Sequence, residues 1–343
     1  MDTESWALKN EGLQNEGSRN EGLQDEELRI VSLIPSATEI VAALGYGDRL
    51  VGRSHECDYP ASVTTLPICT EPKFDPVGSS AQVHQRVSDL LTSALSVYRV
   101  KTEVLAQLRP THVITQAQCE VCAVSLADVK RAVVDLVGGD RATRGQAIQN
   151  PAIQVISLQP ERLADVWTDM ATVAEALGKG AEETAGAIAN LKKRLPNVAS
   201  SPSRARLKVA CIEWTEPLMA AGNWVPELVD LAGGLDCLGK AGAHSAWMSW
   251  ADLAAADPDI IIVLPCGYDL AQTRQATEEM AAQPQWPELR AVKKGAVYLA
   301  DGNQYFNRPG PRLVESCQIL SEIIQQRSPD PTRLSVGWER WRR

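Results

Sequence analysis

Two short runs combine side chains that bind metals. His55, Glu56 and Cys57 are consecutive, and Cys119 and Cys122 form a CxxC pair farther along the chain. Imidazole and thiolate groups are the usual protein ligands of zinc, and they also bind iron. The candidate metal set is therefore His55, Cys57, Cys119 and Cys122. A CxxC pair also suits a redox couple, and surface thiols beside an exposed histidine are the alternative without chemistry.

Polar and aromatic side chains gather where the expected strands end. The carboxyl ends of parallel strands meet at one edge of an open α/β sheet, and ligands bind at that edge. Aromatic walls with a few convergent polar groups are typical of a small-molecule site. The candidate ligand-binding residues are His55, Glu56, Gln118, Glu213, Trp214, Trp247, Tyr305 and Arg308.

The aromatic composition is unusual, with nine tryptophans and two phenylalanines. Tryptophan offers a broad flat face and an N–H donor, so Trp214 and Trp247 could form a wall for a planar macrocycle. Ordinary packing is the alternative for both. Arg308, in an Asn-Arg-Pro-Gly-Pro-Arg turn, is suited to a phosphate, carboxylate or amide of the ligand. Packing at the start of a helix is its alternative role.

The sequence contains no GxSxG, P-loop or HExxH motif, and no cysteine–histidine pair is singled out as a nucleophile. The first hypothesis is therefore a binding protein, not an enzyme. It predicts a tightly bound ligand without turnover. The alternative is a Cys/His-dependent metal-binding protein, such as a metallochaperone or a chelatase-like enzyme on the same scaffold, because the fold alone does not fix the function.

Strand and helix patterns alternate in two blocks that would position these residues. In the first block, we expect strands over 29–35, 48–54, 111–116 and 153–158, and helices over 36–47, 81–108 and 125–137. In the second block, we expect strands over 207–214, 259–265 and 295–301, and helices over 224–234, 249–258, 270–283 and 309–326. Ser36 and Glu39 match a capping box. The alternation predicts an α/β fold of two Rossmann-like lobes with parallel sheets.

Residues 160–196 carry apolar side chains at helical spacing over more than thirty positions. This pattern predicts one long backbone helix that joins the lobes, with Gly178 and Gly180 as possible kinks, and a ligand cleft between the lobes. A rigid connector would allow little motion of the lobes. The predicted domains are a disordered leader 1–28 with repeated Asn-Glu-Gly, a lobe 29–159, the connector 160–196, a lobe 197–330 and a tail 331–343.

The formal net charge of −9 argues against a nucleic-acid partner. The first residues have no basic and apolar leader pattern, and no stretch approaches the length of a membrane span. These features predict a cytoplasmic monomer. Its eight cysteines would then be mostly free thiols.

Five segments resemble one known family. They are RIVSLIPSATEIVAALG at 29–45, VGRSHECDYP at 51–60, THVITQ at 111–116, NWVPELVDLAGG at 223–234 and YFNRPGPRLVE at 305–315. The chain resembles the cobalamin-binding proteins of ABC importers, within the helical-backbone metal receptors, a class III periplasmic-binding-protein-like group. The resemblance spans residues 29 to 327, and its motifs are shared with siderophore and haem relatives.

The resemblance implies a cobalamin or other corrinoid held between the lobes, with haem or an iron chelate as related ligands. It places Glu56 in a ligand-contacting loop and Trp247 at the family's second-lobe tryptophan. Tyr305 and Arg308 match an aromatic–Phe–x–Arg turn. The resemblance also implies an ABC permease as partner, with Glu103 and Asp252 as candidate docking carboxylates. Residues 74–100 are an insertion relative to the family, which argues against such docking.

Overall fold

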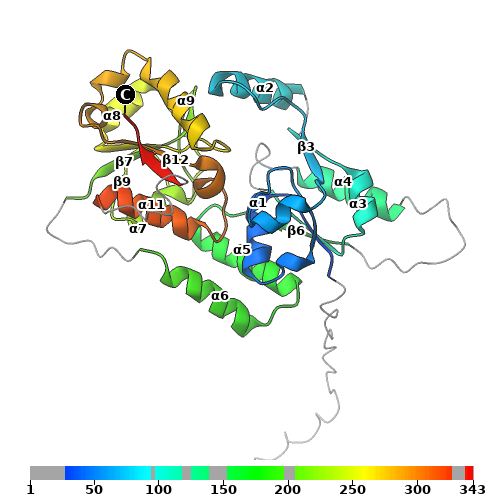
Figure 1. Cartoon of the computed structure of the whole chain (residues 1–343). Coiled ribbons are helices and arrows are strands. Elements are labelled where there is room, and N and C mark those ends of the chain that lie inside the picture. The colour runs from blue at the N-terminus through cyan, green and yellow to red at the C-terminus, as the bar shows by residue number, and fades with distance from the viewer. Residues whose placement is uncertain are drawn as a thin grey trace, which may run out of the picture.

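The structure is a computed structural model that describes residues 28–93, 97–117, 125–138, 153–196, 205–326 and 337–342. Two α/β lobes lie side by side, as Figure 1 shows. Within the described residues, no helix is both long and apolar enough to cross a membrane. The predicted leader 1–28 lies outside the described residues, apart from Leu28.

The N-terminal lobe contains a four-stranded sheet in the order β2-β1-β5-β6, and every pairing in it is parallel. Its strands are β1 (Ile30–Ser32), β2 (Leu50–Arg53), β5 (His112–Gln116) and β6 (Gln154–Leu158). All residues of β1 and β5 are buried, as expected for strands that helices cover on both faces. The covering helices include α1 (Pro35–Ala43), α3 (Thr102–Leu108) and α4 (Leu126–Gly138).

The capping box predicted at the start of α1 is wrong. Ile34 is the N-cap and makes no side-chain cap bond, while Pro35 occupies the first turn. Proline suits that position because its missing N–H would have no partner there. Glu39 is consequently not used at the helix start, and its carboxylate reaches the other lobe.

The single helix predicted over 81–108 is also wrong. This region forms α2 (Ser80–Ser93), β4 (Tyr98–Val100) and α3. Strand β4 pairs antiparallel with β3 (Thr70–Pro72) in a small separate sheet. The strand depends on a partner almost thirty residues earlier, so helical periodicity on either side of it masks it in the sequence.

The predicted long connector is two helices, α5 (Leu163–Ala176) and α6 (Ala181–Lys193), which contact each other. Gly178, with φ of 79°, adopts the left-handed conformation that ends helices, and its neighbour Lys179 donates its N–H back to the Ala174 carbonyl. Helix α5 buries six side chains, whereas α6 buries only Thr184. Helix α5 is therefore the more deeply buried part of the connector, while the end of α6 reaches the C-terminal lobe through the Arg194–Glu315 ion pair.

The C-terminal lobe has a mixed sheet, in contrast to the purely parallel sheet expected. Strands β7 (Lys208–Thr215), β11 (Ile260–Val263) and β12 (Val297–Ala300) are parallel. Short β9 (Leu235–Asp236) also pairs parallel with β7. Antiparallel edges are added by β8 (Leu218–Ala220), β10 (Ala246–Trp247) and β13 (Trp338–Arg340). Strand β13 lies in the predicted tail 331–343, so part of that tail belongs to this lobe.

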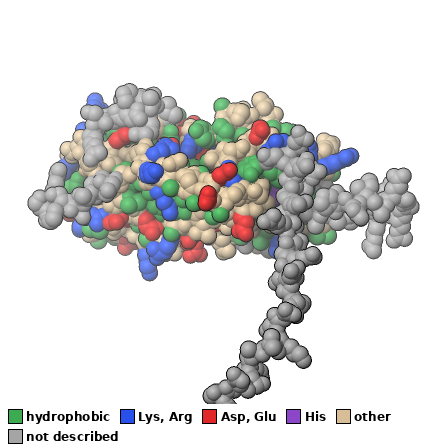
Figure 2. Space-filling model, turned by 90° about the horizontal axis from the view of Figure 1, so that it is seen from below, with side chains coloured by type: hydrophobic (Ala, Val, Ile, Leu, Met, Phe, Trp, Pro, Cys, Tyr) green, Lys and Arg blue, Asp and Glu red, His purple; other side chains and the backbone are tan. Residues whose placement is uncertain are grey.

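The helices of this lobe are α7 (Val225–Leu231), α8 (Trp250–Ala256), α9 (Leu270–Ala281), α10 (Arg290–Lys293) and α11 (Leu313–Gln325). Short 3₁₀ turns occur at Gly47–Arg49, Ala61–Thr65 and Trp286–Glu288. One hydrophobic core runs through both lobes and includes Ile40 of α1, Met170 of α5 and Leu313 of α11. On the face opposite α2, Figure 2 shows acidic and basic side chains interspersed. The predicted two-lobed α/β fold is confirmed.

Candidate ligand-binding site between the lobes

The loops that follow strands of the two sheets meet between the lobes. Asp58 lies in the loop after β2, and Asn303 lies in a π-helical turn, Gly302–Phe306, after β12. The Asn303 side-chain amide donates to Asp58 Oδ2 at 3.1 Å. The carboxyl ends of the strands therefore converge as the sequence predicts.

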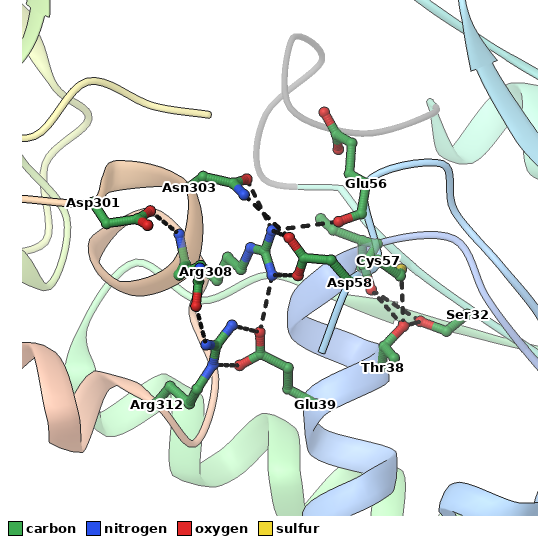
Figure 3. A network of polar contacts seen from close by, with 12 residues as sticks. Ser32, Thr38, Glu39, Glu56, Cys57, Asp58, Asp301, Asn303, Arg308 and Arg312 are labelled. Atoms are coloured by element: carbon green, nitrogen blue, oxygen red, sulfur yellow. Dashed lines mark hydrogen bonds and ion pairs between the residues drawn. The ribbon is translucent and has the colours of Figure 1, made fainter. Parts of the chain in front are cut away.

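An ion cluster of four side chains connects the lobes (Figure 3). Arg308, whose side chain is 5% exposed, bonds to Asp58 Oδ1 at 2.5 Å and Glu39 Oε1 at 3.3 Å. Arg312 donates to both oxygens of Glu39, at 2.7 and 3.0 Å. The Glu39 side chain is 1% exposed. Two guanidinium groups thus neutralise two carboxylates, one of which is fully buried. This ion cluster joins the lobes at what we call the base of the interface.

The charges of this cluster reinforce one another. Burial opposes ionisation of Asp58, but the hydrogen bond and the positive charge of Arg308 outweigh it and hold the pKa of Asp58 below its usual value. Burial would lower the pKa of Arg308, and Asp58 and Glu39 raise it instead. Both partners therefore stay charged at neutral pH.

The guanidinium group of Arg308 is occupied by protein atoms. It also donates to the Glu56 carbonyl at 3.3 Å and to Asn303 Oδ1 at 2.8 Å. Its predicted contact with a ligand remains a prediction, and its observed role is to join the lobes. Sequence reasoning missed the cluster itself. The sequence did contain one indication of it, because Glu39 is the one charged residue among positions 35 to 41 of α1. In the structure all seven of these residues are buried.

His55 and Glu56 lie on the N-terminal side of the interface. His55 Nδ1 lies 2.8 Å from the Thr70 hydroxyl, and its Nε2 is 3.9 Å from Glu56 Oε1. Burial, followed by the charges of Lys101 and Arg53, lowers the pKa of His55 to about 4. The imidazole is therefore neutral at pH 7, the form that binds metals.

Tyr98 completes this N-terminal group. Its hydroxyl donates to Glu56 Oε1 at 3.1 Å, and its ring lies 5.2 Å from the His55 ring. Burial raises the pKa of Glu56, against the opposing effects of Tyr98 and Arg308. The neutral imidazole of His55 and the ring of Tyr98 give this group apolar area beside the Glu56 carboxyl.

Cys57 is not placed to bind a metal. Its side chain belongs to the hydrophobic core, and its sulfur lies 3.0 Å from the Thr38 hydroxyl. Burial raises the pKa of the thiol to about 11, so it stays protonated at neutral pH. Gln118, Cys119 and Cys122 lie outside the described residues. Among the residues that are described, no group of three or more His, Cys, Asp or Glu side chains could hold a metal ion.

Two tryptophans of the C-terminal lobe lie near contacts with the other lobe, because Trp247 packs on His84 and Trp214 precedes Thr215, which bonds to Ser80. The Trp214 ring lies 5.3 Å from the Tyr268 ring, and Trp247 is 56% exposed. Glu213, next to Trp214, accepts a hydrogen bond from the Ser245 hydroxyl at 2.8 Å. The Tyr305 ring is buried and faces the guanidinium of Arg312 at 5.4 Å, so it supports the ion cluster.

The structure thus arranges the described candidate residues in two connected groups. Arg308 belongs to the ion cluster, beside which His55, Glu56 and Tyr305 lie. Glu213, Trp214 and Trp247 lie close together on β7 and β10 of the second sheet, since Trp214 and Trp247 both pair with Met219 of β8. The Asn303 N–H bonds to the Tyr268 carbonyl at 3.0 Å and links the two groups.

Two hollows in the surface of the C-terminal lobe lie elsewhere. One of about 880 Å³ is lined by Tyr298 and Trp338, and one of about 340 Å³ is lined by Pro284 and Leu289. Neither contains a candidate ligand-binding residue. The case for a site between the lobes therefore depends on the side chains that meet there.

The candidate docking carboxylates lie on different lobes. Glu103 is exposed in the first turn of α3. Asp252 accepts hydrogen bonds from the Ser249 hydroxyl at 2.7 Å and the Ser249 N–H at 2.8 Å, and these bonds lower its pKa. Asp252 thereby caps α8, and the docking role of both residues stays a prediction.

Known proteins are similar to this chain in sequence or in fold. A relative described as an uncharacterized ABC transporter substrate-binding lipoprotein, YvrC of Bacillus subtilis (strain 168), is 23% identical over 304 residues, which are 86% of this chain and 79% of the relative. The haem-binding protein RhuT from Roseiflexus sp. RS-1 superimposes with a TM-score of 0.62 at 19% identity, covering 88% of this chain and 98% of that one. The vitamin B12-binding protein BtuF of Vibrio cholerae gives a TM-score of 0.56 at 18% identity, with 88% and 98% covered.

These relatives overturn the predicted cytoplasmic location. The Bacillus protein is named a lipoprotein, and the RhuT and BtuF structures are named periplasmic. The cytoplasmic prediction depended on the pattern of the residues that precede the first strand, whereas the similarity to these relatives extends over both lobes. A family model described as periplasmic binding protein matches residues 30–303, which is most of the chain and includes parts of both lobes. The chain therefore belongs to the periplasmic binding protein family.

Proposed function

We propose that this chain binds a metal-chelate macrocycle of the haem or corrinoid type between its lobes, outside the cytoplasm, and delivers it to an ABC importer. The named relatives support this proposal, since one is an ABC transporter substrate-binding lipoprotein and two bind haem or vitamin B12. Its family is one of binding proteins, in agreement with the prediction that the chain is not an enzyme.

The main observation behind the proposal is that an aromatic surface on one lobe and a polar group on the other lie on the two sides of the interface. Trp214 and Trp247 supply flat aromatic area on one lobe. His55, Glu56 and Tyr98 supply a compact polar group on the other. A planar chelate combines apolar faces with a polar rim and a metal centre, so it matches both surfaces.

The neutral imidazole of His55 narrows the ligand class. One ring nitrogen is held by Thr70, and such an anchored, uncharged ring is a good ligand for a metal centre that has an exchangeable axial position. Haem and corrinoids that carry a labile axial water meet this condition. Among corrinoids, cobalamin is the ligand that we propose to test first.

The metallochaperone or chelatase alternative gains no support. Cys57 faces the core, and the described residues hold no cluster able to bind a free metal ion. For a permease partner, we keep Glu103 and Asp252 as the proposed docking carboxylates, because each is exposed on its own lobe. Sedimentation velocity tests the monomer that we propose.

Titration of the full chain with hemin, aquocobalamin, aquocobinamide and a ferric hydroxamate, followed by absorbance, tests the function. We expect a spectral shift with at least one macrocycle and none with the hydroxamate. Trp214→Ala should weaken binding about tenfold or more, because it removes a large contact area. Tyr298→Ala is the matched control, since this half-buried aromatic lies at the amino end of β12, away from the interface. Absence of binding to every macrocycle would refute the proposal.

A further inference from the structure

Helix α2 belongs to one lobe by sequence and contacts both in space. It lies within the segment between β3 and β4, whose pairing anchors it to the N-terminal lobe. Figure 1 shows α2 at the top of the molecule, extending from β3 toward α9 of the other lobe. The helix therefore crosses the interface that contains the proposed site.

The first half of α2 contacts the C-terminal lobe. The Thr215 hydroxyl at the end of β7 donates to Ser80 Oγ at 2.7 Å, and both residues are buried. One turn later, the His84 ring meets the Trp247 ring edge to face at 5.1 Å. Trp247 is an aromatic residue of the proposed site, so α2 touches the wall that a chelate would use.

The second half of α2 packs on its own lobe. Val87 and Leu90 lie against the cluster that contains Tyr98 and Val97. Among the described side chains of α2, only Ser80 and Val83 are buried. A helix held by so few buried contacts opens at a low free-energy cost. Its attachment to the C-terminal lobe, which includes the Ser80–Thr215 hydrogen bond and the His84–Trp247 ring pair, is the part that can release.

We infer that α2 is a lid over the ligand site, anchored at the β3–β4 sheet and latched to the C-terminal lobe by Ser80 and His84. The inference rests on the proposed function. Release of the latch moves His84 off Trp247 and opens the top of the interface to the chelate. In this proposal the latch closes over the filled site as well as the empty one, so it controls the rates of binding and release more than the affinity.

Stopped-flow absorbance of the full chain tests the lid, with whichever of hemin and aquocobalamin the wild type binds more tightly. His84→Ala should raise the association and dissociation rate constants together by about three- to tenfold, the worth of one aromatic ring pair. The equilibrium constant should change by less than about twofold. Gln85→Ala is the control and should leave both rates unchanged, because this exposed neighbour of His84 bonds to Asp89 of the same helix.

Hydrogen exchange of the ligand-free chain gives an independent readout. Amides of residues 80–93 should exchange faster in His84→Ala than in Gln85→Ala. Equal exchange, or equal rate constants in the two variants, would overturn the lid while chelate binding by the wild type stands. A rise in dissociation alone would also overturn it, because it would mark His84 as a direct ligand contact. If the wild type binds no macrocycle, the proposed function fails and the lid fails with it.

Discussion

Two of the places where the lobes meet differ in kind. At the base, Glu39 and Asp58 pair with Arg308 and Arg312, and three of the four side chains are almost fully buried. At the top, α2 reaches the second lobe through the Ser80–Thr215 hydrogen bond and the His84–Trp247 ring pair. Separation of the base would strand charges in a low dielectric, whereas separation of the top would expose a few polar and aromatic groups.

This difference teaches where motion is possible. The sequence suggested that one long helix would hold the lobes apart, but the connector breaks at Gly178. The shared hydrophobic core and the ion cluster, not a single rigid helix, hold the lobes in their relative orientation. The base therefore fixes the relative orientation of the lobes, and ligand access is left to the top.

The largest effect should come from the base. Glu39→Ala removes the carboxylate that both buried arginines share, so we expect the free energy of unfolding to fall by about 3–5 kcal/mol. Urea denaturation of the two proteins measures this change. Glu288→Ala is the control, because its side chain is 76% exposed in the pair with Lys293, and exposed ion pairs contribute little to stability, so a far smaller loss is expected. Similar losses in both variants would mean that the base is not a clamp.

The next effect concerns His55, which precedes Asp58 in the loop that reaches the base. Its folded pKa of about 4 lies below the ordinary 6.5, chiefly because of burial. Between pH 6.5 and pH 4 the unfolded chain therefore binds a proton at His55 that the folded chain does not bind. The free energy of unfolding is unaffected by this group above pH 6.5 and falls as the pH is lowered toward 4. The loss should reach about 2–3 kcal/mol, since partial exposure of the ring to solvent reduces the effect of the full shift.

The unfolding free energies of the wild type and His55→Gln at pH 7.5 and pH 4.5 isolate this contribution. Asp169 and Asp301, whose pKa values burial raises to about 6, act in the opposite direction in both proteins and cancel in the difference. The wild type should lose more stability on acidification than the variant does. Superimposable pH profiles would show that His55 is not held neutral by its surroundings.

The smallest effect should come from the top. Ser80→Ala removes one buried hydrogen bond and leaves the Thr215 hydroxyl without that partner, so we expect a loss of about 1 kcal/mol. Ser62→Ala, at an exposed serine, should change the unfolding free energy by less than about 0.5 kcal/mol. A loss at Ser80 as large as that at Glu39 would remove the contrast between base and top.

Local patterns in the sequence determined much of this fold. Apolar runs located the strands that became β1, β5 and β11, which are buried throughout. Helical spacing located most of the helices, and the alternation of the two patterns predicted two α/β lobes. Strand ends then pointed to the interface, because the edge of a parallel sheet is where its loops converge.

Only the tertiary structure decided the roles of individual side chains. Glu39 matched a cap and became the centre of an ion cluster, and Cys57 matched a metal ligand and entered the core. Residues 81–108 have the apolar spacing of one helix, yet residues 98–100 form strand β4 because they pair with β3. Each outcome depends on a partner distant in sequence, and local spacing carries no record of which distant group will be near enough to pair.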